Sequence, residues 1–272
     1  MDIAQNVNYQ GQATKFPSIA IWNRVEQALR GNLGGIILED NFLSFNGSVT
    51  SNVGTYSSQA GGWLSYEDTG STVATIETEV GGVLKITTDT TDNDEIWLQP
   101  GGAKQVIGKI TSGDSGLLAY EIRVRPNQIV TQNAFFGLSE ETLAAADTVS
   151  DAGAFASKDM IGFNLAEAAS STMTFAYRTA GQALTTPITA LKTVVAATWY
   201  KFGFLYDAQA PTSKRIRVFV DGVEQSTYVT ATNIAATAFP TGEELNLLMG
   251  LKNGAAAATR WDVDWVKVGF AF

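Results

Sequence analysis

Two short acidic runs are the residues of this sequence whose types and spacing come closest to chemistry. Asp92, Asp94 and Glu95 lie within four residues, and Glu77 and Glu79 stand two residues apart. Side chains at i and i+2 of a β-strand lie on one face, so the second pair has the spacing of a shared face. Retaining glycosidases use two carboxyl groups about 5–5.5 Å apart. Carboxylate and carbonyl oxygens are also the ligands that Ca²⁺ prefers.

Neither run has the surroundings that catalysis requires. Asp92 and Asp94 fall at an expected turn, and Glu77 and Glu79 have no third acid beside them. We therefore interpret both runs as solvated acidic segments rather than as a catalytic pair. Asp92 and Asp94 remain a calcium candidate, although the run lacks the EF-hand spacing and an ordinary polar turn is the alternative. No other metal and no cofactor are expected.

Composition excludes several classes of function. The 272 residues contain no cysteine and no histidine, so disulfides, thiolate chemistry, imidazole bases and histidine-ligated metals are all absent. The net charge is −9 and no Lys/Arg cluster occurs, which argues against nucleic-acid binding. No run of 18 apolar residues predicts a membrane span, and the first residues do not have the pattern of a signal peptide.

The first 35 residues are expected to form an arm and one helix. Residues 1–17 have no periodicity and are read as an extended arm. Ile21, Trp22, Val25 and Leu29 then form one apolar stripe, which predicts a helix over 18–30 that ends before Gly31.

From residue 36 to the end the pattern is that of β-structure in one domain. Residues 120–125 alternate apolar with charged, and Asp221-Gly222 predicts a two-residue hairpin. In the last strand the apolar parity changes near residue 265, which predicts either a bulge or burial of both faces. The expected strands are 36–39, 62–66, 72–78, 83–88, 95–99, 117–125, 134–139, 160–165, 172–178, 199–206, 215–220, 223–229, 245–251 and 259–270. Many short strands without intervening helices predict an all-β antiparallel sandwich or jelly roll.

The order of these segments carries a resemblance to a known superfamily. It consists of EDNF (39–42), GVLKITT (82–88) with EIWL (95–98), AYEIRVR (119–125), AFFGL (134–138), DMIGF (159–163), TWYKF (198–202), VFVDGV (218–223) and WDVDWVKV (261–268). Over residues 36–272 the chain resembles the concanavalin-A-like lectin/glucanase jelly rolls, and in particular those that tailed phages carry as virion decoration or structural proteins.

That resemblance implies a non-enzymatic role and a location at the virion surface. Laminarinase-type members carry a Glu-x-Asp-x-x-Glu strand, which this chain lacks, and legume-type lectins use a histidine at their manganese site. We therefore expect a capsid decoration (cement) protein at the virion surface, assembled in the bacterial host cytoplasm. Its expected partners are the major capsid protein and further copies of itself, as a homotrimer.

Residues 1–35 are the expected attachment and oligomerisation segment. They carry a net charge of +1 while the rest of the chain carries −10 (−9 − 1). The residues expected to contact the capsid or neighbouring copies are Trp22, Arg24, Val25, Leu29 and Arg30. The equally weighted alternative is that the helix packs back onto its own sandwich as a cap.

Two further functions stay open. The first is a lectin-like module or adhesin that binds a host-surface glycan through exposed aromatic residues. Trp63, Trp97, Trp199 and Trp261 fall in strand patterns and are expected in the core, so Tyr56 and Tyr66 are the glycan candidates. The second is a diverged glycoside hydrolase that uses Glu77 or Glu79.

Overall fold

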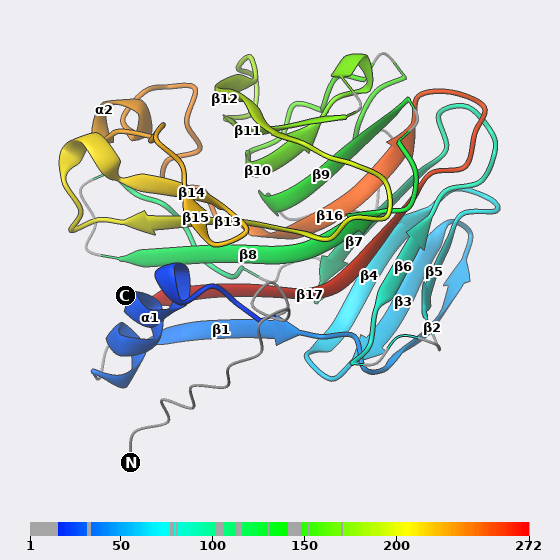
Figure 1. Ribbon diagram of the computed structural model, residues 1–272, viewed down its shortest axis with the longest axis horizontal. Helices are drawn as coiled ribbons and strands as arrows, with labels where there is room; N and C mark the ends of the chain where they lie inside the picture. The colour runs from blue at the N-terminus through cyan, green and yellow to red at the C-terminus, as the bar shows by residue number, and fades with distance from the viewer. Residues whose placement is uncertain are drawn as a thin grey trace.

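The computed structural model describes residues 16–31, 34–76, 79, 81–101, 106–112, 116–129, 131–140, 148–151, 153–169 and 171–271. These residues form two antiparallel sheets that pack face to face as a sandwich, with one helix of three turns on its outside (Figure 1). No helix among the described residues is long and apolar enough to cross a bilayer. The expected all-β sandwich is confirmed.

The eight-stranded sheet contains both ends of the described sandwich. Its order is β15-β14-β13-β8-β17-β6-β5, and β1 pairs with the C-terminal half of β17 beside β6. Its strands are β1 (Gly35–Asp40), β5 (Thr72–Thr75), β6 (Leu84–Thr87), β8 (Leu117–Pro126), β13 (Tyr200–Asp207), β14 (Ile216–Val220), β15 (Val223–Glu224) and β17 (Arg260–Ala271).

The nine-stranded sheet has the order β12-β11-β10-β9-β16-β7-β4-β3-β2. Its strands are β2 (Phe45–Thr50), β3 (Val53–Ser58), β4 (Gly61–Glu67), β7 (Glu95–Pro100), β9 (Gln132–Ser139), β10 (Met160–Leu165), β11 (Thr172–Arg178), β12 (Thr185–Thr193) and β16 (Asn246–Asn253). Short helices η1 (Glu167–Ala169), η2 (Thr212–Lys214) and α2 (Ala231–Ile234) lie in the connections.

The core between the sheets follows from strand alternation. Tyr120, Ile122 and Val124 of β8 point inward and are fully buried, while Glu121 and Arg123 lie on the opposite face. Aromatic rings from both sheets fill the middle, so that Phe163 of β10 packs against Phe202, Phe204 and Phe175 at centroid distances of 5.4, 6.4 and 5.4 Å.

Helix α1 (Ile19–Arg30) covers the outer face of the eight-stranded sheet. Its buried residues form a second apolar cluster with outward-facing side chains of the sheet, including Leu117, Ala119, Leu205 and Phe219. The sheet has glycine where the helix comes closest, and a Cβ at Gly203 would lie 2.6 Å from Cδ1 of Ile21. Of the two alternatives for the helix, the cap on its own sandwich is the arrangement found.

In the last strand the apolar residues change faces near residue 265, and both expected reasons are found: a β-bulge and burial of both faces. The register between β17 and β8 shifts between Val263 and Trp265, and both neighbouring parities of β17 are buried because α1 covers the outer face. The shifted residue, Asp264, pairs with Arg123 at 2.5 Å on that outer face. The Asp221-Gly222 hairpin is confirmed, with φ of 52° and 79° at its two turn residues.

Three strands and one helix lie in segments that the sequence pattern leaves as loops. β2, β3 and β12 sit at or beside the edges of the nine-stranded sheet, where few residues are buried, so they lack an apolar alternation. α2 is one turn held by a capping box between Thr230 and Asn233. The expected strand 223–229 ends at Glu224, and that over 72–78 ends at Thr75, with residues 77–78 outside the described part.

Candidate functional site

The outer face of the nine-stranded sheet is the broad surface on which a ligand could lie. The inward residues of β7, β9 and β16 belong to the main core, so the alternate residues of these strands face outward. On β7 the outward residues are Glu95, Trp97 and Gln99, and Phe135 of β9 and Leu248 of β16 form an apolar cluster with Trp97.

The chain's own segment between β9 and β10 lies over this cluster. Val149 is fully buried there, and the Phe155 ring contacts Phe135 edge-on with a centroid distance of 5.5 Å. Nζ of Lys252 donates to the carbonyl of Val149 at 2.8 Å and to Oδ1 of Asp151 at 2.9 Å. Trp97 and Phe135 are fully buried as a result and cannot serve as platforms for a sugar ring in this arrangement.

Paired carboxylates are missing from the centre of this face. Among the outward positions of β7, β16, β9 and β10, all of which the structure describes, Glu95 is the only acid. Glu95 is buried and accepts a hydrogen bond of 2.7 Å from Nε1 of its neighbour Trp97. These four strands therefore do not bring together the two carboxyl groups that glycoside hydrolysis uses.

Tyr66 lies at the rim of the same face and remains half-buried. Its hydroxyl donates to Oδ1 of Asp68 at 2.9 Å. Burial raises the pKa of Tyr66, and the hydrogen bond to Asp68 acts in the same direction, whereas a hydrogen bond with Asn52 opposes it. Oδ2 of Asp68 accepts from the backbone N–H of Glu95 at 3.0 Å, which ties β4 to the turn before β7. Tyr66 is thus the partly accessible member of the two glycan candidates.

Tyr56 is not a glycan contact, and this expectation is corrected. Its side chain is 8% exposed and stacks on Phe45 in the core at a centroid distance of 4.7 Å. Its hydroxyl donates to Oε1 of the buried Glu67 at 2.6 Å. The glycines and serines around it mark close strand packing rather than a surface loop, because a Cβ at Gly54 would press on the Tyr56 ring.

The acidic turn with the calcium candidates Asp92 and Asp94 brings few carboxylates together. Asp92 is exposed, and burial and the charges of Asp68 and Asp89 raise the pKa of Asp94. Within the described ranges, no three acidic side chains come close enough together to hold a metal ion. The acidic neighbours of Asp94 are Asp89, from the same connection between β6 and β7, and Asp68, which follows β4. Glu79 pairs with Arg125 at 3.0 Å, and Glu77 lies outside the described residues.

The helix residues expected to meet a partner divide into two groups. Trp22 is 3% exposed and Val25 is fully buried, so both side chains hold the helix on its own sheet, and a partner cannot reach them in this arrangement. Leu29 is half-buried at the edge of the same cluster. Arg24 pairs with Asp207 at 3.0 Å, and Arg30 is 82% exposed. The expectation that Trp22 and Val25 contact a partner is therefore corrected. A side chain that is buried against its own sheet cannot bind a partner at the same time.

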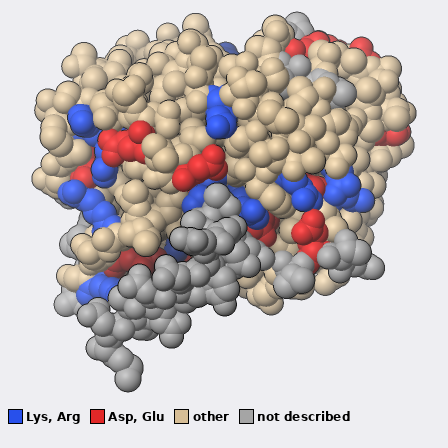
Figure 2. Space-filling view, viewed as in Figure 1, with Lys and Arg blue, Asp and Glu red and all other residues tan. Residues whose placement is uncertain are grey.

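Exposed apolar side chains gather in the first part of the described chain. Seven of the nine large ones, Phe16, Ile19, Ile36, Ile37, Leu43, Val49 and Val53, lie between residues 16 and 53, and the other two are Val195 and Val223. They belong to or adjoin α1, β1, β2 and β3, which follow the lower side of the molecule in Figure 1. We call these seven residues the N-terminal apolar edge. On the face seen in Figure 2, basic and acidic side chains are interspersed.

Comparison with known proteins places the fold. Neither a protein-family model nor a curated protein sequence matches this chain. A protein of unknown function from Shewanella oneidensis MR-1, SO2946, matches in structure with a TM-score of 0.53 and 12% identity over 90% of this chain and 92% of that one. A Bacteroides ovatus mixed-linkage glucan GH16 protein matches with a TM-score of 0.51 and 11% identity, covering 85% and 98% of the two chains. The fold is that of the concanavalin-A-like lectins and glucanases.

A third solved structure, a carbohydrate recognition domain, is also similar to this chain. The carbohydrate recognition domain of Emp47p matches with a TM-score of 0.50 and 14% identity, over 86% of this chain and 94% of that domain. At such identities these similarities show the jelly-roll fold alone. The closed outer face, the corrected position of Tyr56 and the N-terminal apolar edge are features that sequence patterning missed, because each depends on which loop or sheet lies over a given side chain.

Proposed function

We propose that this chain is a non-enzymatic structural protein of a tailed-phage particle, bound as a decoration protein to the outer surface of the capsid. The observation that carries the proposal is the N-terminal apolar edge. Exposed apolar side chains scattered singly are ordinary, but seven of them within one stretch of the chain, residues 16–53, suggest a surface for protein contact. Ile36 and Ile37, at 46% and 40% exposed, lie on β1 and point to opposite faces of its sheet, Ile37 to the face that α1 covers.

The helix contributes to the proposed attachment by its position rather than by its apolar stripe. Because Trp22 and Val25 fix α1 on the sheet, Ile19 and Arg30 are presented at its two ends as exposed side chains. Leu29, Arg24 and Arg30 would then form the border of the contact. The same edge suits contact between copies, and we propose that the protein decorates the virion surface as a homotrimer, assembled in the host cytoplasm.

The outer face of the central strands of the nine-stranded sheet supports a role without catalysis. The nine-stranded sheet has its outer apolar cluster covered by Val149 and Phe155, and its four central strands present Glu95 as their single outward acid. A decoration protein needs a stable fold and one surface that binds the capsid. It does not need an open substrate-binding groove.

Binding to empty shells tests the proposal. Shells assembled from the major capsid protein of the particle that encodes this chain are mixed with the purified protein and sedimented. We expect saturable co-sedimentation that Ile37→Asp weakens at least tenfold, since burying an unpaired charge in an apolar contact costs several kcal/mol. Val195→Asp is the matched control, because Val195 is 57% exposed and lies outside the edge. Failure of the wild-type protein to sediment, or equal binding by Ile37→Asp, would overturn the proposal.

Glycan binding is the second candidate, and Tyr66 is the observation that favours it. A half-buried tyrosine beside a carboxylate, Asp68, is a combination that sugar sites use, and the fold also occurs in the Emp47p carbohydrate recognition domain. A glycan array on which wild-type binding is lost in Tyr66→Ala would support this role, and a blank array at millimolar sugar would count against it.

A further inference from the structure

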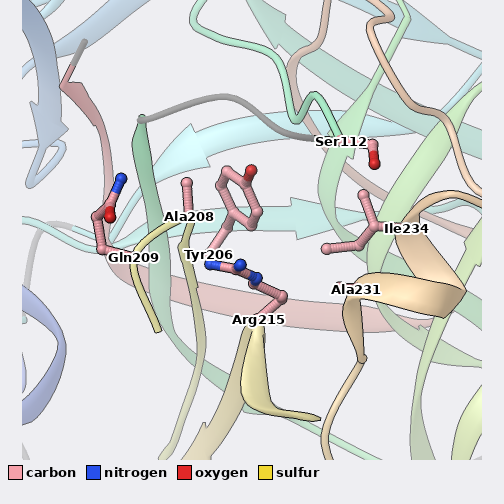
Figure 3. A pocket seen from close by; sticks show the side chains of 7 residues that line it. All are labelled: Ser112, Tyr206, Ala208, Gln209, Arg215, Ala231 and Ile234. Atoms are coloured by element: carbon pink, nitrogen blue, oxygen red, sulfur yellow. The ribbon is translucent and has the colours of Figure 1, made fainter. Parts of the chain in front are cut away.

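A small hollow lies between strands β13 and β14 and helix α2, away from both surfaces described above. Its volume is about 160 Å³. It is lined by Ser112, Tyr206, Ala208, Gln209, Arg215, Ala231 and Ile234, which Figure 3 shows. Arg215 enters from the start of β14 and places its guanidinium next to the Tyr206 ring, while Ile234 closes the opposite side from α2 (Figure 3).

Arg215 lines this hollow, and its guanidinium also carries one unmet hydrogen-bond donor. Its Nη1 atom is buried and donates to no acceptor. Two residues further along the chain, in β14, Arg217 also has a buried Nε without a partner, but its guanidinium forms an ion pair with Glu224 at 3.4 Å. A buried guanidinium donor without an acceptor costs about 1–3 kcal/mol or more, because the group loses its water without gaining a partner.

The seven lining residues supply no negative charge to pair with the Arg215 guanidinium. None of the seven lining residues is acidic, and the Tyr206 hydroxyl donates instead to the carbonyl of Thr111 at 2.9 Å, which leaves the ring as a wall. Ala208, Ala231 and Ile234 form an apolar part of the wall, and Ser112 and Gln209 are its polar, uncharged members. The turn that holds Ala231 and Ile234 is fixed by the capping box, in which the backbone N–H of Asn233 donates to Oγ1 of Thr230 at 3.2 Å.

We propose that this hollow is a binding site for a carboxylate carried on a short apolar chain, with Arg215 as the residue that recognises the charge. A guanidinium presents donors that match a carboxylate. Arg215 is the one charged residue among the seven that line the hollow, and its single positive charge suits the single negative charge of a carboxylate. The apolar walls would take the hydrocarbon part of the ligand.

Butanoate is the probe for this site and butanamide is its neutral counterpart. Methyl resonances of Ala208, Ala231 and Ile234 are followed by NMR while each compound is added to the full-length protein. We expect saturable shifts of these methyl groups with butanoate and none with butanamide. Arg215→Gln should weaken butanoate binding about ten- to a hundredfold, as expected for loss of a charge-assisted hydrogen bond. Arg217→Gln is the matched control on the same strand and should bind as the wild type does.

A second variant keeps the test decisive if Arg215→Gln does not fold. Ala231→Leu fills the hollow without touching the charge, and it should abolish the shifts. No butanoate binding at 50 mM (roughly the weakest affinity that a single such contact predicts), equal binding of butanamide, or unchanged binding in either site variant would overturn the proposal. A tetrapeptide that ends in a free leucine carboxylate separates the two sources of the group. Tighter binding of the peptide than of butanoate points to a protein terminus, and weaker binding points to a free acid.

Discussion

The indole Nε1 of Trp22 donates a hydrogen bond of 2.9 Å to Oε2 of Glu121, and this contact joins the helix to the sheet it covers. The backbone N–H of Ser18 donates to the same oxygen at 2.8 Å, and the Ser18 hydroxyl donates to Oε1 at 2.5 Å. One buried carboxylate therefore accepts three hydrogen bonds from the first turn of α1 and the residue before it.

Replacing Glu121 tests how much the helix depends on that carboxylate. Glu121→Ala leaves three buried donors without an acceptor, and we expect it to lower the free energy of unfolding by about 3 kcal/mol. Glu224→Ala, which removes a surface ion pair on β15, should cost less than about 1 kcal/mol in the same urea titration. Equal midpoints for wild type and Glu121→Ala would show that the helix is held by its apolar stripe alone.

Glu67 predicts a pH dependence of stability. Burial raises the pKa of Glu67 above its ordinary value of 4.5, although hydrogen bonds from Ser65 and Tyr56 act in the opposite direction. The folded state then holds the proton more tightly than the unfolded state, so the contribution of Glu67 to stability falls as the pH rises from 4.5 through the folded pKa. Glu67→Gln cannot ionise, so it should gain stability relative to the wild type over this window. A stability difference between the two proteins that stays constant from pH 4 to about 7 would contradict the assignment.

Phe155 is expected to hold the covering segment on the nine-stranded sheet. Phe155→Ala removes its contact with Phe135 and should cost about 2–4 kcal/mol if the segment stays in place, and less if it detaches. Hydrogen exchange distinguishes the two results, because detachment raises exchange at residues 148–151 and 153–159 while β9 remains protected. Unchanged exchange together with unchanged stability would mean that Val149 alone covers the sheet.

Much of this arrangement could be predicted from strand patterning, and the exceptions share a cause. Strands β10 and β11 match their expected bounds because both alternate or bury continuous apolar residues between clear breaks. β2 was missed because one of its six residues is buried, which leaves no alternation to detect. Tyr56 was misplaced because a glycine- and serine-rich neighbourhood is typical of loops as well as of closely packed strands.

The site needed tertiary information for a different reason. The apolar stripe of α1 shows which residues are covered but does not show whether the cover is its own sheet or a partner. Trp97 is fully buried although it lies on an outward strand position, because Val149 and Phe155 come from a segment between β9 and β10 that has no periodicity. Arg215 and the α2 residues Ala231 and Ile234 line the same hollow, but no pattern in the sequence indicates that they lie close together.

Trp199 gives a test of the charged outer face of the eight-stranded sheet. Its ring lies 4.2 Å from Cζ of Arg123 and 4.5 Å from Cζ of Arg125, and both arginines pair with acids of β17. Trp199→Ala should lower the free energy of unfolding by about 1–2 kcal/mol through loss of these stacking contacts. Trp199→Phe keeps an aromatic face and should recover part of that loss, and no recovery would assign the effect to volume instead.

The Asp221-Gly222 turn touches the start of the helix, which two glycines with the same backbone angle can reveal. Gly222 and Gly181 both have φ of +79°, but a Cβ at Gly222 would lie 3.0 Å from Oγ of Ser18 and one at Gly181 would meet nothing within 4 Å. Gly181→Ala should therefore cost only the backbone strain of about 1 kcal/mol, and Gly222→Ala should cost more. Equal melting midpoints for the two variants would show that the turn and the helix are not coupled.

Cryo-electron microscopy of the particle that carries this chain is the most direct measurement of its proposed role. The account predicts a β-sandwich density on the outer capsid surface, with Ile37 and the ends of α1 at the contact and the outer face of strands β7, β9, β10 and β16 turned away from the shell. A capsid without such density, or a sandwich bound through the outer face of β7, β9, β10 and β16 with Ile37 and the ends of α1 facing solvent, would contradict it.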